Sequence, residues 1–286
     1  MTMRWLALLV AAGCAKPAPA PAPSPQPALT RKQQRALKRQ GVAAYERKDW
    51  AACGSLLEQA GDWYDAACCH AQAGARDRAF AALDRVDGRA VTIDHLKQDP
   101  DLASLHADPR WPTAVEHVTA VIAAHRAKSN AELAQLHDAD QAARQSDHID
   151  WNVVAPQDRA RRVRVQQIVD AGGAKTADDW FHAAMVFQHG DTPDEIQHAY
   201  DYARRAVELD PTHDTARWLM AAALDRKLMY EKKPQKYGTQ YQKAGPDAPW
   251  VLYEVDPATT DDEREEMGVP PLAEARARAE QMNARK

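Results

Sequence analysis

The residues best suited to ligand binding lie in the second half of the 286-residue chain. Polar groups gather in the stretch Gln235-Lys-Tyr237-Gly238-Thr239-Gln240, which follows the pair Asp225-Arg226. Two amides, a phenol, a hydroxyl and a conformationally free glycine exceed what a connection between two helices requires. We therefore predict a binding surface built by backbone and amide contacts in this stretch.

A histidine adds the chemistry of proton transfer. His189 follows Gln188 and precedes Gly190, a residue typical of helix C-termini. One hypothesis is a hydrolytic or ligand-binding site in which His189 acts as acid or base. In this site Asp225 would orient His189, and Arg226 would hold an anion. The predicted binding residues are Gln188, His189, Asp225, Arg226, Gln235, Tyr237, Gly238, Thr239 and Gln240.

The same residues also permit a purely structural interpretation. Asp225-Arg226 is compatible with an intramolecular ion pair, His189 with a helix cap, and the amides with satisfaction of buried backbone groups. Nucleophile motifs, phosphate-binding glycine loops and metal-ligand spacings such as Cys-x-x-Cys or His-Glu-x-x-His are missing from the sequence. The sequence therefore favours a non-enzymatic binding protein and predicts neither a cofactor nor a metal.

Composition indicates the elements that must position these groups. The chain has only 12 glycines and 3 phenylalanines but many Ala, Arg, Gln and Glu residues, and no long stretch alternates with period two. We predict an all-α fold. The formal net charge of −4, spread along the chain, predicts no nucleic-acid partner.

The N-terminal half is predicted to form two helix pairs, over residues 30–47 with 50–60 and over 63–74 with 75–83. The second pair resembles the tetratricopeptide repeat, whose small-residue, turn and packing positions are matched by Ala67, Gly74, Ala79 and Leu83. The first pair fits one residue out of register. The resemblance implies stacked helical hairpins that bind peptides or partner helices.

Residues 93–113 resemble the closing element of bacterial repeat arrays. The match consists of Asp99-Pro100-Asp101-Leu102 and Asp108-Pro109-Arg110-Trp111. In each Asp-Pro pair the aspartate is predicted to cap a helix and the proline to begin its first turn. The element would cover apolar surface at the end of the stack.

The C-terminal half is predicted to begin with a long helical region over residues 114–145. Helices follow at 178–188, after the capping box Thr192-Pro-Asp-Glu195, and over about 213–229. The chain over residues 131–280 resembles the bacterial domain-of-unknown-function 6624 family. The resemblance rests on Asp140-Gln141-Ala-Ala-Arg144, Gln188-His189, Asp225-Arg226, Gln235-Lys-Tyr237-Gly238-Thr239-Gln240, Asp256, Arg264, Gly268 and Pro271-Leu272. It implies an all-helical domain and no particular activity.

The N-terminus indicates export and anchoring. A short apolar run ends in Ala11-Ala12-Gly13 before Cys14, which resembles a lipobox with Ala11 in place of the usual leucine. A plain cleaved signal is the alternative. The Ala/Pro-rich segment that follows would extend roughly 40 Å as a polyproline tether. Cys14 is thus the predicted lipidation site, and the absence of acidic residues after it favours the periplasmic face of the outer membrane.

Three further cysteines, Cys53, Cys68 and Cys69, would face an oxidising periplasm. A bridge from Cys53 to Cys68 or to Cys69 is one interpretation. The favoured interpretation is three small hydrophobic residues in a helical core.

These patterns predict four segments: a signal peptide over 1–13, a tether over 14–29, a repeat region with its closing element over 30–125, and a helical domain over 126–286. The predicted function is that of a lipid-anchored envelope protein whose repeats bind another envelope protein or peptide. The alternative is a ligand-binding or hydrolytic C-terminal domain.

Overall fold

A computed structural model describes residues 29–89, 91–145, 149–245 and 248–284 of the chain. The predicted signal peptide, Cys14 and nearly all of the tether lie outside the described residues. The described part is all-α, as predicted, with strands of only two residues each. None of its helices is both long and apolar enough to cross a membrane.

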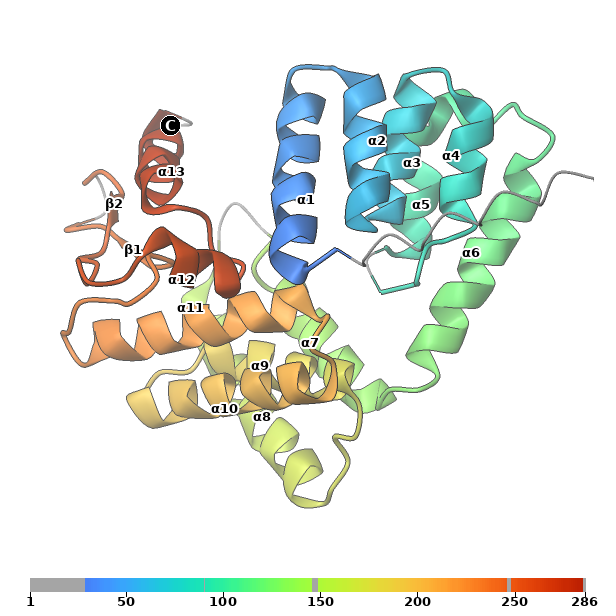
Figure 1. Cartoon of the computed structure of the whole chain (residues 1–286). Coiled ribbons are helices and arrows are strands. Elements are labelled where there is room, and N and C mark those ends of the chain that lie inside the picture. The colour runs from blue at the N-terminus through green and yellow to red at the C-terminus, as the bar shows by residue number, and fades with distance from the viewer. Residues whose placement is uncertain (1–28, 90, 146–148, 246–247, 285–286) are drawn as a thin grey trace, which may run out of the picture.

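Figure 1 shows the order of the helices and strands along the chain. Their bounds are α1 Arg31–Glu46, α2 Trp50–Ala60, α3 Trp63–Gln72, α4 Arg76–Leu83, α5 Ile93–Gln98, the 3-10 helix η1 Pro100–Leu105, α6 Trp111–Arg126, α7 Ala131–Ala142, α8 Trp151–Asp170, α9 Ala177–Gln188, α10 Pro193–Leu209, α11 Asp214–Tyr230, α12 Asp261–Glu266 and α13 Leu272–Ala284; the strands are β1 Tyr241–Gln242 and β2 Val251–Leu252.

Helices α1 to α4 stand side by side as two antiparallel hairpins, which together with α5, η1 and α6 we call the hairpin unit (Figure 1). Ala67, Ala79 and Leu83 are fully buried in its core. Helices α2 and α3 approach closely because Gly54 has no side chain: a Cβ there would lie 2.3 Å from the His70 ring. His70 is itself buried and contacts Glu58 Oε1 at 2.9 Å.

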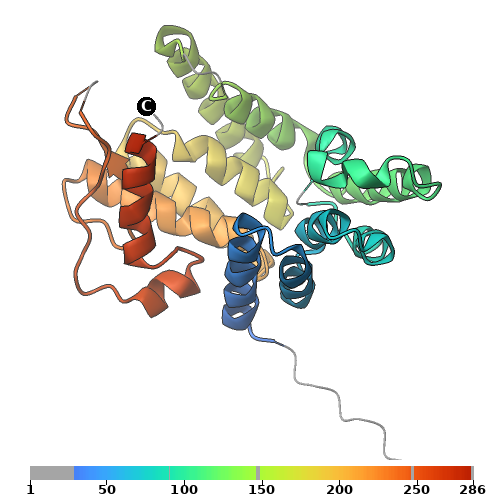
Figure 2. The ribbon, with the colours of Figure 1, turned by 90° about the horizontal axis from the view of Figure 1, so that it is seen from above.

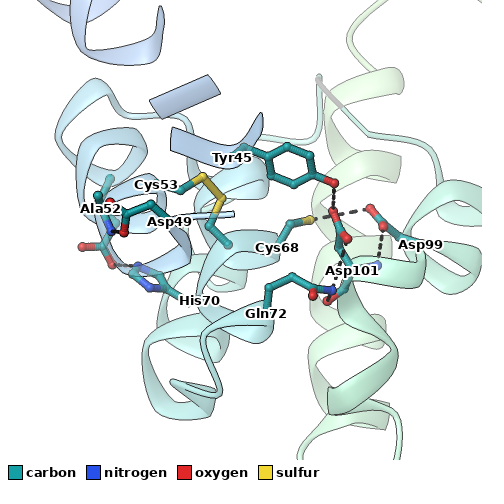
Figure 3. The surroundings of a disulfide bond; sticks show 11 residues. Tyr45, Asp49, Ala52, Cys53, Cys68, His70, Gln72, Asp99 and Asp101 are labelled. Carbon is teal, nitrogen blue, oxygen red and sulfur yellow. Dashed lines mark hydrogen bonds and ion pairs between the residues drawn. A yellow bond between two sulfur atoms is a disulfide. The ribbon is translucent and has the colours of Figure 1, made fainter. Parts of the chain in front are cut away.

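A disulfide joins Cys53 of α2 to Cys69 of α3, with 5.8 Å between their Cα atoms (Figure 3). The favoured interpretation of three unbridged core cysteines was therefore wrong. Antiparallel packing brings these two positions together, whereas Cys68, one residue away, lies on another side of α3 and is a buried free thiol. The bridge fixes the contact between the two hairpins.

The closing element is held by its aspartates (Figure 3). Tyr64 of α3 donates to Asp99 Oδ2 at 2.8 Å, and Tyr45 of α1 donates to Asp101 Oδ2 at 2.7 Å. Asp99 also caps η1, accepting from the Asp101 amide at 2.9 Å, as predicted for the first Asp-Pro pair. The second pair differs, because α6 begins only at Trp111 and Asp108 instead accepts from the Arg110 amide in the preceding turn.

The predicted continuous helical region over 114–145 is divided into α6 and α7. Asn130 causes the division, because its side chain accepts from the amides of Glu132 and Leu133 and thereby caps a new helix. The chain turns here from the hairpin unit into the C-terminal domain, with α6 as the link between them (Figure 1).

Helices α7 to α11 form the C-terminal domain around a second core that runs from Leu133 to Ala223. Helix α10 packs between α9 and α11. Thr192 caps α10 by accepting from the Glu195 amide, as the predicted capping box requires. The Glu195 carboxylate does not bond the Thr192 amide in return, and instead accepts from the Asp191 amide and from Arg162. After α11 the chain forms the loop over residues 235–240, which we call the polar loop. The β1–β2 pair, α12 and α13 follow it.

The two units also meet through α1, which lies between the other hairpin helices and the C-terminal segments (Figure 2). Arg31 pairs with Asp214 at 2.9 Å at the start of α11. Arg35 and Arg39 pair with Glu265 of α12. Helix α1, the first helix of the described residues, is thus tied to α11 and α12 near the end of the chain.

Candidate functional site

Asp225 organises the predicted polar loop. Its fully buried carboxylate accepts hydrogen bonds from the Lys236 and Tyr237 amides at 2.8 Å each, and from the Thr239 amide and hydroxyl at 3.0 and 2.9 Å. Burial raises the pKa of Asp225, and these donors act in the opposite direction. With four donors around it, this carboxylate is occupied within the fold.

The two glutamines close the loop upon itself. Gln235 donates through Nε2 to the carbonyls of Gln240 and Tyr253, and its Oε1 accepts from the Gln240 amide at 2.8 Å. Gly238 provides the positive φ of 90° that the bend requires. Tyr237, 9% exposed, packs against Ala221 and Val269 in a small core of its own. The loop is therefore a fixed structure rather than an open recognition surface.

Arg226 connects this loop to the end of α9. Its Nε donates to Gln240 Oε1 at 3.1 Å and its Nη1 donates to the Gln188 carbonyl at 2.8 Å. The next two carbonyls, of His189 and Gly190, accept from Arg162 at 2.9 Å and from the Tyr230 hydroxyl at 3.3 Å. Three side chains thus satisfy consecutive carbonyls at a helix C-terminus, which have no partner within the helix.

His189 is held from the other side of the domain. Its Nδ1 lies 2.8 Å from Asp140 Oδ2, and Asp140 is fully buried on α7. Arg144 contacts Asp140 Oδ1 at 3.0 Å and joins it to Asp158. Because a carboxylate accepts, Nδ1 carries the proton, and Nε2 of the neutral ring is the atom left to accept a hydrogen bond.

The structure brings the predicted residues of the C-terminal domain together in two adjoining sets: Arg226 links Gln188 to the loop that Asp225 holds, whereas His189 bonds Asp140. Two predicted contacts are wrong. Asp225 bonds the loop and neither pairs with Arg226 nor orients His189, because the loop amides fill its carboxylate. Asp140 takes the orienting position instead. Cys14, the predicted lipidation site, lies outside the described residues.

The network includes residues that were not predicted as part of the site. Asp140 precedes His189 by 49 positions, so no local spacing links them. Arg264, 2% exposed, donates to the carbonyls of Tyr237 and Thr259 and fixes the far side of the loop. Only the family resemblance, which includes Asp140 and Arg264, marked them in the sequence.

A second charged cluster joins the two units at Asp178 of α9. Arg89 Nε, from the hairpin unit, lies 3.0 Å from Asp178 Oδ1, and His125 Nε2 of α6 lies 2.6 Å from Oδ2. His213, at the start of α11, approaches Oδ1 at 3.3 Å. Burial alone would raise the pKa of Asp178, but the approach of His213 and the charges of Arg89 and His125 lower it below its ordinary range.

Two cavities open at this junction. The larger, about 440 Å³, is lined by Arg89, His125, Lys128, Lys175 and Asp178, with Ser129, Thr176, Ala177, Leu209 and Asp210 completing its wall. The smaller, about 230 Å³, lies between the hairpins and the start of α11 and shares Arg89. Both take residues from each unit, and none of the nine predicted residues lines either of them.

One group of side chains has metal-ligand types. Cys68 Sγ and carboxylate oxygens of Asp99 and Asp101 lie within 4.8 Å of one another (Figure 3). Tyrosine hydroxyls and the Gln72 amide already donate to these carboxylates, and burial raises the pKa of Cys68, which keeps the thiol protonated. We assign the group to attachment of the closing element.

Comparison with family models, with curated proteins and with solved structures finds no match to this chain.

Proposed function

We propose that this protein is a lipid-anchored scaffold of the bacterial envelope that binds a protein or peptide partner at the junction between its two units. In this proposal Cys14 is acylated, and the Ala/Pro-rich tether positions the helical units in the periplasm, at the outer membrane. The repeat-like hairpins supply one wall of the binding surface, and the C-terminal domain supplies the other.

The observation that supports this proposal is the pair of cavities at the junction. The larger cavity lies within the range of about 300–1,000 Å³ that ligand sites occupy. Lys128 and Lys175 are exposed at its wall and have no carboxylate partner within the described residues. Partner recognition by helical repeats uses surfaces of this kind between packed elements.

The hydrogen bonds of the polar loop argue against catalysis by the residues predicted there. Asp225, Gln235 and Gln240 use their polar atoms to hold the backbone, so they are committed to the fold. A catalytic carboxylate needs a lone pair free for substrate. The alternative in which Asp225 orients His189 as an acid or base therefore lacks its orienting contact, because the loop fills the Asp225 carboxylate.

The junction is tested by site-specific photo-crosslinking in a bacterial host. A photoreactive amino acid at Lys175 lines the larger cavity, whereas one at Val163, exposed on α8, serves as the control. We expect a discrete crosslinked species from position 175 and none from position 163. Equal crosslinking from both positions, or none from 175, would contradict a partner site at the junction.

Anchoring is tested in the same host with Cys14→Ser. The variant is expected to leave the membrane fraction and to lose the crosslinked species from position 175. If Cys14→Ser stays in the membrane fraction, the lipoprotein proposal fails, whatever the crosslinking result.

A further inference from the structure

Two lysines line the larger junction cavity, one from each unit. Lys128 lies just after α6, the last helix of the hairpin unit, and Lys175 lies just before α9 of the C-terminal domain. Both residues are exposed, and neither has a carboxylate within ion-pair distance among the described residues. An acidic group that enters the cavity therefore meets positive charges on both sides of the junction.

The carboxylates of the same wall are already engaged. Asp178 Oδ1 lies 3.0 Å from Arg89 Nε, and its Oδ2 lies 2.6 Å from His125 Nε2. Asp210 Oδ2 accepts from Arg89 at 2.9 Å. The other oxygen of Asp210 accepts from the Thr212 amide at 2.8 Å and from the Thr212 hydroxyl at 2.6 Å. Each carboxylate oxygen of the wall thus has a partner in the fold, whereas the two ammonium groups remain available to a ligand.

The charges of the lining residues favour an anionic ligand. Arg89, Lys128 and Lys175 are opposed by Asp178 and Asp210, which leaves one positive charge in excess. The whole chain, by contrast, has a formal net charge of −4. An acidic molecule is therefore attracted to this cavity and not to the surface in general.

The groups of the wall are better suited to the carboxylates of a peptide than to a phosphate. The guanidinium of Arg89 is engaged by two aspartates. Each lysine presents a point charge, without the planar fork by which arginine holds a phosphate in two parallel bonds. Leu209, 42% exposed, lies in the same wall and offers an apolar contact. Carboxylates beside an aliphatic side chain complement this combination.

We propose that the larger junction cavity binds an acidic segment of the partner protein. Lys128 and Lys175 pair with separate carboxylates of that segment, and Leu209 contacts a neighbouring aliphatic side chain. This inference rests on the junction scaffold proposed above and gives the chemical class of the segment bound there. Because the two lysines come from different units, the bound segment also bridges the hairpin unit and the C-terminal domain.

Fluorescence anisotropy with the purified full chain in detergent tests the charge requirement. The probe is a labelled glutamate-rich peptide with leucines at its centre, and the comparison peptide has glutamine in place of each glutamate. Lys128→Gln combined with Lys175→Gln removes both charges from the cavity. Lys48→Gln combined with Lys97→Gln is the matched control, since these exposed lysines line neither cavity. Substitutions at such exposed positions should leave the fold intact, which circular dichroism verifies.

We expect the acidic peptide to bind the unmodified protein and the Lys48/Lys97 control equally. The Lys128/Lys175 variant should bind it roughly tenfold more weakly, because two partly exposed ion pairs are lost. The glutamine peptide should bind more weakly than the acidic peptide, and added sodium chloride should weaken binding of the acidic peptide. No binding of the acidic peptide, or equal binding by the two double variants, overturns the inference.

Photo-crosslinking in the bacterial host separates this inference from the proposed function. A photoreactive amino acid at Leu209 lines the cavity and leaves both lysines in place. A crosslinked species that is lost in the Lys128/Lys175 variant, and persists in the Lys48/Lys97 control, supports an acidic segment. An unchanged yield in both variants overturns the acidic class but leaves the junction as the partner site. Absence of any crosslinked species from positions 175 and 209 overturns the junction proposal itself.

Discussion

At the scale of single residues, Asp225 is the group on which the polar loop depends. Asp225→Asn keeps the size but turns one acceptor oxygen into a donor, which then faces either the Lys236 and Tyr237 amides or the Thr239 amide and hydroxyl. We expect this change to lower the free energy of unfolding by roughly 3 kcal/mol. Urea denaturation followed by circular dichroism measures the loss. Asp201→Asn, at a side chain 44% exposed on α10, should change stability by less than about 0.5 kcal/mol.

His182 gives the molecule a second residue-scale property, sensitivity to acid. Burial lowers the pKa of His182 to about 4, and the neighbouring charge of His137 adds to this effect. The unfolded residue titrates near about 6.5, so between about 6.5 and 4 the unfolded chain binds the extra proton. Stability should therefore fall as pH is lowered through that window, by at most roughly 3 kcal/mol from this residue.

The acid effect is measured by urea denaturation at pH 7 and pH 4.5. His182→Gln should reduce the loss of stability between the two pH values, because its amide does not titrate. His117→Gln, an exposed residue, should leave that loss unchanged. An equal loss in His182→Gln and in the unmodified protein would show that His182 is not responsible.

Local sequence predicted which residues gather but not how they pair. His189 ends a helix and Asp225 and Arg226 lie near the end of another, so polar groups were expected to meet where helix ends meet. The partner of His189 is Asp140, whose position depends on how α7 packs against α9. A pattern of spacing carries no information about such a tertiary contact.

At the scale of elements, the Cys53–Cys69 bridge should stabilise the hairpin unit. It closes a short loop with a sequence separation of 16, for which chain entropy predicts about 3 kcal/mol. The double substitution Cys53→Ser and Cys69→Ser should lower the free energy of unfolding by about that amount. Cys68→Ala leaves the bridge intact and is the control for loss of a buried sulfur.

Peptide mapping without reduction identifies the pairing itself. A disulfide-linked peptide that contains Cys53 together with Cys69 is expected. A Cys68 pairing would contradict the structure. The double variant would contradict the stabilising role if its melting temperature matched that of the unmodified protein.

Helix boundaries were the easiest features to predict, because a helix cap depends only on residues within a few positions of it. Trp50–Ala60 and the start of α10 after Thr192 follow directly from local residues. The division at Asn130 and the choice between Cys68 and Cys69 were missed. The division of the helical region could be predicted only by recognising Asn130 as a cap within an otherwise helical pattern. The identity of the bridged cysteine depends on the rotation of α3 against α2.

At the scale of the whole molecule, Arg89 couples the hairpin unit to the C-terminal domain through Asp178 and Asp210. Arg89→Gln leaves these carboxylates with fewer cationic partners, and we expect the junction to open more often. Hydrogen exchange of amides in α6 and at the start of α9 should become several-fold faster. Arg78→Gln removes a surface pair within the hairpin unit and should leave these amides unchanged.

If exchange at the junction is the same in Arg89→Gln as in the unmodified protein, the units are held by other contacts. The sequence could not indicate this junction, because its members lie on separate elements whose docking only the folded chain defines. The all-α class, by contrast, could be predicted from composition and periodicity, because these are properties of each local stretch of sequence and do not depend on how helices dock.

The position of α1 also determines how the molecule responds to mechanical load. A pull on the chain before Thr30 enters α1 at its first turn, where Arg31 and Arg35 are bound to Asp214. The load therefore passes sideways into the C-terminal domain at the same point where it enters the hairpins. Both units share the force from the outset, so tension on the N-terminal segment draws on the contact between them rather than peeling the hairpins apart one helix at a time.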